Sequence, residues 1–367
     1  MVPTSIFNIS SLESISLLSN RFNGSLPLNI GYNLPNLEKF IIAQNNFTGS
    51  LPESLSNASK LVQLVLAENH FSGKVSIDFS GIKNLTLLNL GINNLGNGAA
   101  NDLEFITSLT NCSKLEKIGL YQNNFGGLQP HSIVNLSTTI TAMAIGTNQI
   151  SGTIPPGIKN LDKLNAIGME YNQLTGTIPH SIGQLKNLQA LQLQGNSLKG
   201  SIPTSLGNLT LLTQLVLVSN NLQGRIPASL GNCQNLMVLV LNKNKLTGTV
   251  PRQIFGITTL SLELDLSENL FSGPFPLEVG SLQSLIVLNI SRNQFSGEIP
   301  VTLGGCTSLQ YLNLQGNCFS GSIPPSLSSL RSIQELDLSS NNLSEQIPEF
   351  LETLSFLEYL NLSHNHF

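Results

Sequence analysis

Residues 212–227 have the sequence LTQLVLVSNNLQGRIP, and close variants of this stretch recur along the whole chain. Its Asn at position 220 belongs to a ladder with a period of 24 or 25 residues and one wider interval of 30 residues at 93–123. A fixed period of this length is typical of a solenoid, in which each repeat forms one coil. We call the fifteen ladder residues the rungs: Asn20, Asn45, Asn69, Asn93, Asn123, Asn148, Asn172, Asn196, Asn220, Asn244, Asn269, Asn293, Asn317, Asn341 and Asn365.

Each fixed position of the repeat has a chemical reason. Leucines five and three residues before the rung predict a short strand with one buried face. We expect the rung amide to bond the backbone of the next coil's turn, where polar groups are otherwise buried and unpaired. Gly stands four residues after the rung in twelve of fourteen repeats, where we expect a turn that needs the backbone freedom of glycine. Pro stands three residues after this Gly position, also in twelve of fourteen repeats. Phe two residues after the rung predicts one stacked aromatic spine: Phe22, Phe47, Phe71, Phe125, Phe271, Phe295, Phe319 and Phe367.

The repeats together predict one continuous fold. A coil of this kind cannot bury its apolar face alone, so neighbouring coils must stack. We therefore predict an α/β-type solenoid with a parallel inner β-sheet, forming a single domain over residues 1–367 with about fifteen repeats. Val2 and Pro3 fit the end of an earlier repeat and Phe367 falls in mid-repeat, so we expect both ends to cut through a repeat.

Composition excludes several classes of protein. Charged residues are 10% of the chain, against about 25% in typical soluble proteins, and the net charge is −4. The chain therefore lacks the basic footprint of a nucleic-acid-binding protein. It has no run of about 18 apolar residues, so the sequence predicts neither a membrane span nor direct membrane contact by this segment.

The sequence has no catalytic motif. Its five histidines lack a metal-ligand spacing with a carboxylate, although His364 and His366 flank a rung. The phosphate-binding loop and the kinase triplets HRD and DFG are absent. The sequence therefore predicts no catalytic residue, no metal and no cofactor, and it disfavours an enzyme.

Three of the four cysteines occupy a position usually held by a core leucine. Cys112, Cys233 and Cys306 each stand eleven residues before a rung. Cys233 and Cys306 are three coils apart, or about 14 Å at the usual strand spacing, which is too far for a disulfide. We expect three buried free thiols and a half-exposed thiol at Cys318.

The 30-residue interval lacks the Gly and Pro of the other repeats. Asn101 and Glu104, followed by Ile106 and Leu109, predict a short outer helix whose start is capped. Two interpretations stay open: an island that contacts a ligand, or an enlarged outer connection.

The inner, concave face of the solenoid is the predicted binding surface, because repeat proteins usually bind there. Eleven acidic and four basic residues give this face a charge of −7, whereas the whole chain carries −4, so the other positions sum to +3. The face also holds four of the five tyrosines, and Tyr is enriched in recognition surfaces. Because an acidic lining favours a cationic partner, we predict a protein or peptide ligand of basic character.

The predicted ligand contacts fall into three groups. The first group is Tyr121, Glu170 and Tyr171. The second group is an apolar patch of Val216, Val238 and Val240, with Val218 and Met237 beside it. The third group is an acidic patch that includes two tyrosines: Glu263, Asp265, Glu268, Tyr311, Glu335, Asp337, Glu358 and Tyr359. A second interpretation is that Asp265 and Asp337 only make the surface soluble, because the sequence Leu-Asp-Leu-Ser is common in repeats of this kind.

Eleven sequons for N-glycosylation are present, although a chain rich in Asn and Ser has several by chance. Asn289 and Asn361 are the informative ones, because we expect them to project from the inner sheet, where a glycan would block contact. The candidates are Asn8, Asn23, Asn46, Asn57, Asn84, Asn111, Asn135, Asn208, Asn289, Asn342 and Asn361.

The repeat resembles the plant-type class of leucine-rich repeat proteins, in which Ile-Pro after the turn Gly, as in GTIP at 152–155, marks a lateral second strand. The match covers the whole chain. The finer resemblance is to receptor-kinase ectodomains of the subfamily that includes the bacterial EF-Tu receptor and the rice bacterial-blight-resistance receptor kinase. It is carried by LGNG (95–98), DLEFITSLTNC (102–112), LSTT (136–139) and LSLELDLS (260–267). This resemblance implies a right-handed superhelix with short 3-10 or irregular outer segments and a lateral second strand.

The resemblance also implies a cell-surface receptor of plant immunity that binds a microbial or endogenous protein or peptide and pairs with a co-receptor kinase at the plasma membrane. The signal peptide, terminal cysteine caps, membrane helix and kinase of such receptors are not in this sequence, so we expect a piece of an ectodomain. The alternative is a secreted leucine-rich repeat inhibitor of a microbial wall-degrading enzyme, which is typically shorter and capped at both ends.

Overall fold

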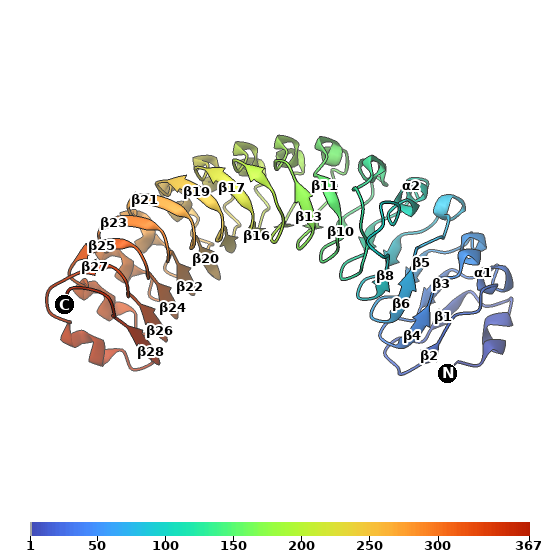
Figure 1. Cartoon of the computed structure of the whole chain (residues 1–367), viewed down its shortest axis with the longest axis horizontal. Helices are drawn as coiled ribbons and strands as arrows, with labels where there is room; N and C mark the ends of the chain where they lie inside the picture. The colour runs from blue at the N-terminus through green and yellow to red at the C-terminus, as the bar shows by residue number, and fades with distance from the viewer. Residues whose placement is uncertain (1) are drawn as a thin grey trace. The chain divides into compact units, whose positions relative to one another are not determined.

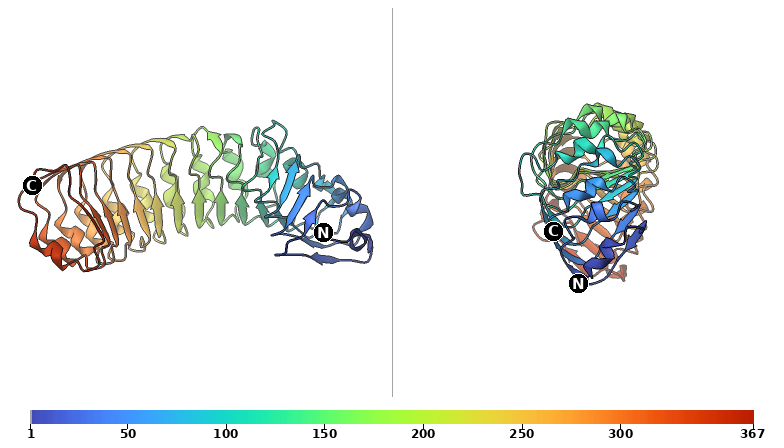
Figure 2. Two further views of the ribbon diagram at one scale, coloured as in Figure 1. Left: turned by 60° about the horizontal axis from the view of Figure 1, so that its bottom comes forward. Right: turned by 90° about the vertical axis from the view of Figure 1, so that its right-hand side faces the viewer.

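The computed structural model describes residues 2–367, which form two compact units, Met1–Thr175 (unit 1) and Gly176–Phe367 (unit 2). Each unit is a stack of coils in which an inner strand, a turn, a lateral strand and a short outer helix repeat. In unit 2 the inner strands line one side of the stack and the short helices line the other (Figure 1). Figure 2 shows the coils of unit 2 lying side by side.

The inner strands are parallel and three residues long. Their register is residue for residue, so that Leu215 lies opposite Leu239. From β1 to β26 the central residue of each inner strand is buried, which confirms the predicted strand pattern. Unit 1 contains β1 (Ser14–Ser16), β3 (Lys39–Ile41), β5 (Gln63–Val65), β7 (Leu87–Asn89), β9 (Lys117–Gly119), β10 (Ala142–Ala144) and β12 (Ala166–Gly168). Unit 2 contains β14 (Ala190–Gln192), β16 (Gln214–Val216), β18 (Val238–Val240), β20 (Glu263–Asp265), β22 (Val287–Asn289), β24 (Tyr311–Asn313), β26 (Glu335–Asp337) and β28 (Tyr359–Asn361).

A lateral strand follows the rung in most coils, as the plant-type pattern implies. The lateral strands also pair in parallel between coils. In unit 1 they are β2 (Asn23–Gly24), β4 (Asn46–Gly49), β6 (His70–Gly73), β8 (Asn94–Leu95), β11 (Ser151–Thr153) and β13 (Gln173–Thr175). In unit 2 they are β15 (Lys199–Gly200), β17 (Asn221–Gly224), β19 (Lys245–Gly248), β21 (Leu270–Pro274), β23 (Gln294–Glu298), β25 (Cys318–Gly321) and β27 (Asn342–Leu343).

The outer connections are short helices, most of them 3-10, which confirms the predicted fold class. In unit 1 they are η1 (Thr4–Asn8), α1 (Ile30–Asn33), η2 (Glu53–Asn57), η3 (Phe79–Gly81), α2 (Phe105–Leu109), η4 (His131–Asn135) and η5 (Pro156–Asn160). In unit 2 they are η6 (His180–Gln184), η7 (Thr204–Asn208), η8 (Ala228–Asn232), η9 (Arg252–Gly256), η10 (Leu277–Ser281), η11 (Val301–Gly305), η12 (Pro325–Ser329) and η13 (Glu349–Thr353).

The 30-residue coil contains the predicted helix, α2, but the predicted cap is wrong. The N-cap residue is Glu104, and its side chain makes no capping hydrogen bond. Asp102 holds this segment instead: its Oδ2 accepts from the backbone N–H of Asn97, Ala99 and Gly126, each at 3.0 Å. A buried carboxylate needs several donors, and here three backbone groups supply them.

The rung asparagines bond to the preceding coil, so the predicted direction toward the next coil is wrong. Asn244 Nδ2 donates to Leu217 O in the preceding coil (3.0 Å) and to Leu241 O in its own coil (3.1 Å). Its Oδ1 accepts from Leu222 N, 3.0 Å away in the preceding coil. The turn of each coil therefore presents its free backbone groups to the rung that follows it.

The aromatic spine is interrupted, which corrects the prediction of one continuous stack. Phe47 stacks on Phe71 in unit 1, with ring centroids 6.1 Å apart. In unit 2 Phe271, Phe295 and Phe319 stack at 6.0 and 6.3 Å. Between Phe71 and Phe271 this position holds buried aliphatic residues and one phenylalanine, Phe125, whose ring packs on Phe105. The aliphatic residues are Leu95, Ile150, Leu174, Leu198, Leu222 and Leu246.

The residue before each rung adopts a left-handed backbone, which the sequence pattern did not indicate. Glycine occupies this position only at Gly195 and Gly316. The other thirteen are side-chain-bearing residues as different as Ile92, Tyr171 and Arg292, with φ between 49° and 58°. This conformation turns the chain out of the inner strand and fixes where the side chain before each rung projects.

Three of the four cysteines lie as predicted, because Cys112, Cys233 and Cys306 are buried free thiols. Cys318 is exposed rather than half-exposed. Burial raises the pKa of Cys112 and Cys233 to about 11 and that of Cys306 to about 12.

Candidate ligand-binding surface

Small residues give the inner face of unit 1 a flat floor. The ring of Tyr121 lies so close over Gly91 that a Cβ there would collide with it, and the carboxylate of Glu170 covers Gly146 in the same way. Tyr171, in contrast, is 57% exposed. The floor residues are Gly91, Gly119, Ala142, Ala144, Gly146, Ala166 and Gly168. Sequence reasoning missed this floor, although its signal was present in glycines that lie between the inward leucines rather than at turns.

The predicted apolar patch forms on β16 and β18. Val216 lies directly opposite Val240 in the sheet register. Val240 is only 8% exposed, and Val216 and Val238 are half-buried. Met237 is 38% exposed at the edge of this patch. The structure therefore brings the three predicted valines together on one continuous surface.

Glu263 and Asp265 lie beside these valines. They are on β20, with Glu263 opposite Val238 and Asp265 opposite Val240. Burial raises the pKa of Glu263, and the neighbouring charge of Asp265 raises it further. Burial also raises the pKa of Asp265, although hydrogen bonds from Ser267 act in the opposite direction. Burial beside the valines thus raises the free energy of the charged form of both carboxyl groups.

The two aspartates of the predicted acidic patch are engaged in hydrogen bonds within the sheet. Asp265, 8% exposed, accepts from Ser267 N at 2.9 Å and from Asn289 Nδ2 at 3.4 Å. Asp337 likewise accepts from Ser339 N at 2.9 Å and from Asn361 Nδ2 at 3.3 Å. These bonds tie each turn to the next strand, so both aspartates have a structural role.

The acidic residues of the predicted patch form two separate clusters. The first, which we call cluster A, consists of Glu263, Asp265 and Glu268, and Lys243 pairs with Glu268 at 3.8 Å. The second, cluster B, places Glu335 between Tyr311 and Tyr359 in the sheet register, with Asp337 and Glu358 nearby in sequence. Because three strand spacings, about 14 Å, separate β20 from β26, the predicted acidic patch is divided in two.

Cluster B has the more accessible groups. Glu335 and Glu358 are exposed, and Tyr359 is 48% exposed. The hydroxyl of Tyr311 donates to Gln334 Oε1 at 3.0 Å, which holds that ring against the sheet. The carboxylates and rings of cluster B can therefore contact a ligand without rearrangement of the strands.

The sequons divide by exposure. Asn289 and Asn361 are half-buried on inner strands, and their amides are held by the aspartates described above. The other nine sequon asparagines are exposed and lie outside the inner strands. The inner face is thus the surface of each unit that these exposed sequons leave bare.

Two searches of the described residues bear on other kinds of site. Within residues 2–367, no group of three or more His, Cys, Asp or Glu side chains is placed to hold a metal ion. The same stretch contains no helix with the length and apolarity needed to cross a membrane.

Family and sequence comparisons match parts of the chain. Residues 36–58, 162–222, 284–306 and 307–352 match families described as leucine-rich repeats. The LRR receptor-like serine/threonine-protein kinase EFR of Arabidopsis thaliana is 46% identical over 72 residues, 20% of this chain and 7% of that protein. The receptor kinase-like protein Xa21 of Oryza sativa subsp. japonica is 50% identical over 60 residues, 16% of this chain and 6% of that protein. The matched stretches are therefore small parts of these relatives.

Solved structures match nearly the whole chain. The leucine-rich repeat ectodomain of GASSHO1/SCHENGEN3 from Arabidopsis thaliana, in complex with CASPARIAN STRIP INTEGRITY FACTOR 2, is 34% identical with a TM-score of 0.87; the match covers 99% of this chain and 46% of that one. The ectodomain of the Arabidopsis receptor kinase HAESA, with an extended IDA peptide hormone, is 30% identical with a TM-score of 0.65, covering 100% and 72%. Another HAESA structure contains IDA and the co-receptor SERK1. These matches confirm the predicted leucine-rich repeat fold and its resemblance to receptor-kinase ectodomains.

Proposed function

We propose, because this chain belongs to the family of leucine-rich repeat ectodomains of plant receptor kinases, that it is the part of such a receptor that recognises a protein or peptide outside the cell. The ligand, microbial or endogenous, lies on the inner face and has basic character. A co-receptor ectodomain joins the complex at the extracellular side of the plasma membrane. The chain itself performs no chemistry in this role.

The observation that carries this proposal is the pairing of apolar and acidic groups on the inner face of unit 2. Val216, Val238 and Val240 provide a dry surface, and Glu263 lies at its border. Apolar contact provides affinity, while a charge of known sign selects the partner and speeds its approach. Support for the peptide class comes from HAESA, whose ectodomain was solved with the peptide hormone IDA, and support for a co-receptor comes from the SERK1 complex.

Charge reversal tests the acidic clusters. In Glu263→Lys/Glu335→Lys/Glu358→Lys, we expect a fluorescein-labelled dodecapeptide that contains six lysines to bind at least about tenfold more weakly at low salt than it binds the unmodified chain. The salt dependence of binding should also decrease, because fewer opposite charges meet. Fluorescence anisotropy at two salt concentrations measures both effects.

The matched control reverses three carboxylates on outer helices: Glu278→Lys/Glu349→Lys/Glu352→Lys. It changes the net charge by the same amount, so an equal loss of affinity in this control would refute binding at the inner face. For the unmodified chain, binding should weaken on acidification at a higher pH than for an ordinary Glu, because the raised pKa of Glu263 lets that group lose its charge earlier.

A further inference from the structure

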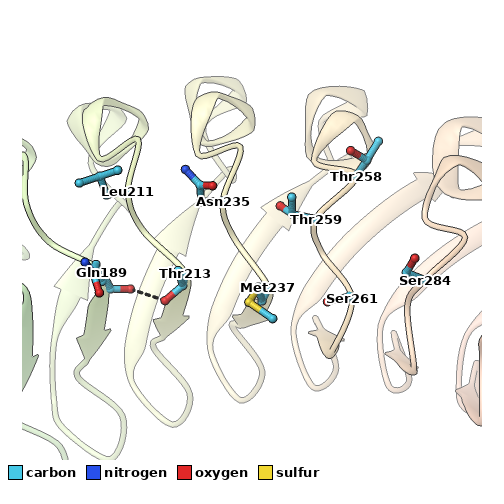
Figure 3. Close-up of a pocket in the computed structure, with 9 residues that line it drawn as sticks. All are labelled: Gln189, Leu211, Thr213, Asn235, Met237, Thr258, Thr259, Ser261 and Ser284. Carbon is cyan, nitrogen blue, oxygen red and sulfur yellow. Dashed lines mark hydrogen bonds between the residues drawn. The ribbon is translucent and has the colours of Figure 1, made fainter.

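A groove on the flank of unit 2 is lined by residues outside clusters A and B. Its volume is about 610 Å³, within the range of roughly 300–1,000 Å³ found for ligand pockets. It crosses five successive coils, from that of β14 to that of β22, a span of about 19 Å at the usual strand spacing. We call it the lateral groove. Its lining residues are Gln189, Leu211, Thr213, Asn235, Met237, Thr258, Thr259, Ser261 and Ser284 (Figure 3).

The groove lies where one coil has an additional residue. Three residues separate Leu260 from Leu264, whereas two separate the corresponding leucines of the coil at 212–215. Met237 O, in the coil before, accepts from both Leu262 N at 3.1 Å and Glu263 N at 3.4 Å. The two coils therefore stay joined by backbone hydrogen bonds beside the groove.

The lining of the groove is uncharged and contains no aromatic ring. Leu211 is 44% exposed and Met237 is 38% exposed, so two aliphatic side chains face solvent here. Phosphate groups select Arg and Lys, and aromatic rings supply large recognition surfaces. Neither is present among the nine lining residues, which favours an aliphatic and uncharged occupant.

The polar groups of the groove offer both acceptors and donors. Thr213 Oγ1 donates to Gln189 O at 2.9 Å, and Thr259 Oγ1 donates to Gln234 O at 2.8 Å, so these two hydroxyls present their lone pairs to a partner. Asn235 Nδ2 donates to Thr210 O at 2.8 Å. The other polar side chains of the lining carry N–H or O–H groups as well as acceptor oxygens: Gln189, Thr258, Ser261 and Ser284. The groove therefore suits a partner that supplies both N–H and C=O groups, as a polypeptide backbone does.

The corresponding flank of unit 1 has a different character. Lys60 and Lys114 stand nine residues before their rungs, as Leu211 does in unit 2. Their Nζ atoms donate to Asn36 Oδ1 and Asn84 Oδ1, both at 2.8 Å. The flank of unit 1 is thus basic and carries a sequon at Asn84, whereas no sequon occurs between residues 209 and 288. The nine residues that line the groove in unit 2 include no basic side chain and no sequon asparagine, and the sequon asparagine Asn208 lies three residues before Leu211.

We propose that the lateral groove is a second binding surface, which takes an uncharged, extended segment of a partner protein. A segment of about six residues spans the five coils. An aliphatic side chain of the segment packs against Leu211 and Met237, and its backbone N–H groups donate to Thr213, Asn235 and Thr259. The groove borders cluster A at Glu263, but none of its lining residues belongs to cluster A or cluster B.

A positional-scanning library of acetylated and amidated hexapeptides tests this assignment on the immobilised chain. We expect the central positions to select Leu, Ile, Met or Val over Lys, Arg, Asp and Glu by at least about tenfold. Leu211→Lys should abolish the selection, because it places a charge beside the aliphatic side chain. The fold accepts Lys at this register, since Lys60 and Lys114 occupy it in unit 1.

Two further variants make the result decisive. Met237→Glu should also abolish the selection, and Glu already occurs at the same register in Glu38 and Glu116. The control Leu277→Lys adds a charge to unit 2 at an exposed outer position and should leave the selection intact. Absence of any aliphatic preference, or a preference that survives both groove variants, overturns the proposal. So does binding of the neutral oligosaccharide chitohexaose at this groove with no hexapeptide selected.

Discussion

At the scale of single residues, each rung amide joins two coils. Asn244 makes three hydrogen bonds through Nδ2, to Leu217 O, Leu241 O and Asn242 O, and its Oδ1 accepts from Leu222 N. Removal of the amide leaves Leu222 N without its acceptor. The three carbonyl oxygens each keep a second donor, which is Asn220 Nδ2 for Leu217 O, Asn269 Nδ2 for Leu241 O and Ser219 N for Asn242 O. We therefore expect Asn244→Ala to lower the free energy of unfolding by about 1–3 kcal/mol in urea denaturation followed by circular dichroism.

The matched control for this prediction is Asn20→Ala. Asn20 is exposed and donates to Leu17 O and Leu18 O, both in its own coil. Its replacement should cost less than about 1 kcal/mol. Similar losses in the two variants would show that bonds between coils contribute little beyond the local turn.

At the scale of elements, the 30-residue coil depends on Asp102 rather than on a capped helix. Asp102 is 1% exposed and accepts three backbone N–H groups, whereas Asn101 is exposed. We expect Asp102→Ala to destabilise the protein by about 3 kcal/mol or more, because charged acceptors make the stronger hydrogen bonds. Hydrogen exchange should accelerate at Asn97, Ala99 and Gly126. Asn101→Ala should change neither quantity, and a larger effect of this variant would restore the capping interpretation.

The same coil shows why sequence reasoning succeeds for some features and fails for others. The spacing of Ile106 and Leu109 predicts α2, because apolar residues on one helix face must meet the core. Either Asn101 or Asp102 could stabilise this segment, and the choice depends on which side chain meets backbone donors from a later coil. Local spacing in the sequence does not give this long-range contact. Likewise, the sequence spacing from a rung to the preceding coil equals its spacing to the following coil. The period therefore predicts where the rungs lie but not which of the two coils their side chains bond to.

The candidate surface follows a similar rule. Equal spacing fixes the register, so the contact between Val216 and Val240 was predictable. The burial of Asp265 was not, because it depends on a hydrogen bond from Asn289 in the next strand. The lateral groove runs past the coil with the additional residue, and its volume and lining are seen only in three dimensions.

At the scale of the whole molecule, the cysteines report on the integrity of the stack. With pKa values of about 11 to 12, the buried thiols are thiolates to the extent of one part in a thousand or less at pH 8. We expect iodoacetamide to modify Cys318 alone in the native protein and all four cysteines in concentrated urea, as mass spectrometry measures. If residues 1–367 behave as one domain, Cys112 in unit 1 and Cys233 in unit 2 should become reactive over the same range of urea. Earlier labelling of one of them would show that the units unfold separately.

The backward bonding of the rungs also gives synthesis a preferred order. From the second coil on, a rung side chain finds one acceptor and its donor in the coil that was made before it, as Asn244 does in the coil of Asn220. A ribosome adds about 5–20 residues per second, so a new 24-residue coil emerges every few seconds onto a stack whose bonding groups are already in place. The chain can therefore assemble coil by coil from its N-terminal side as it is translated, with each finished coil acting as the template for the next.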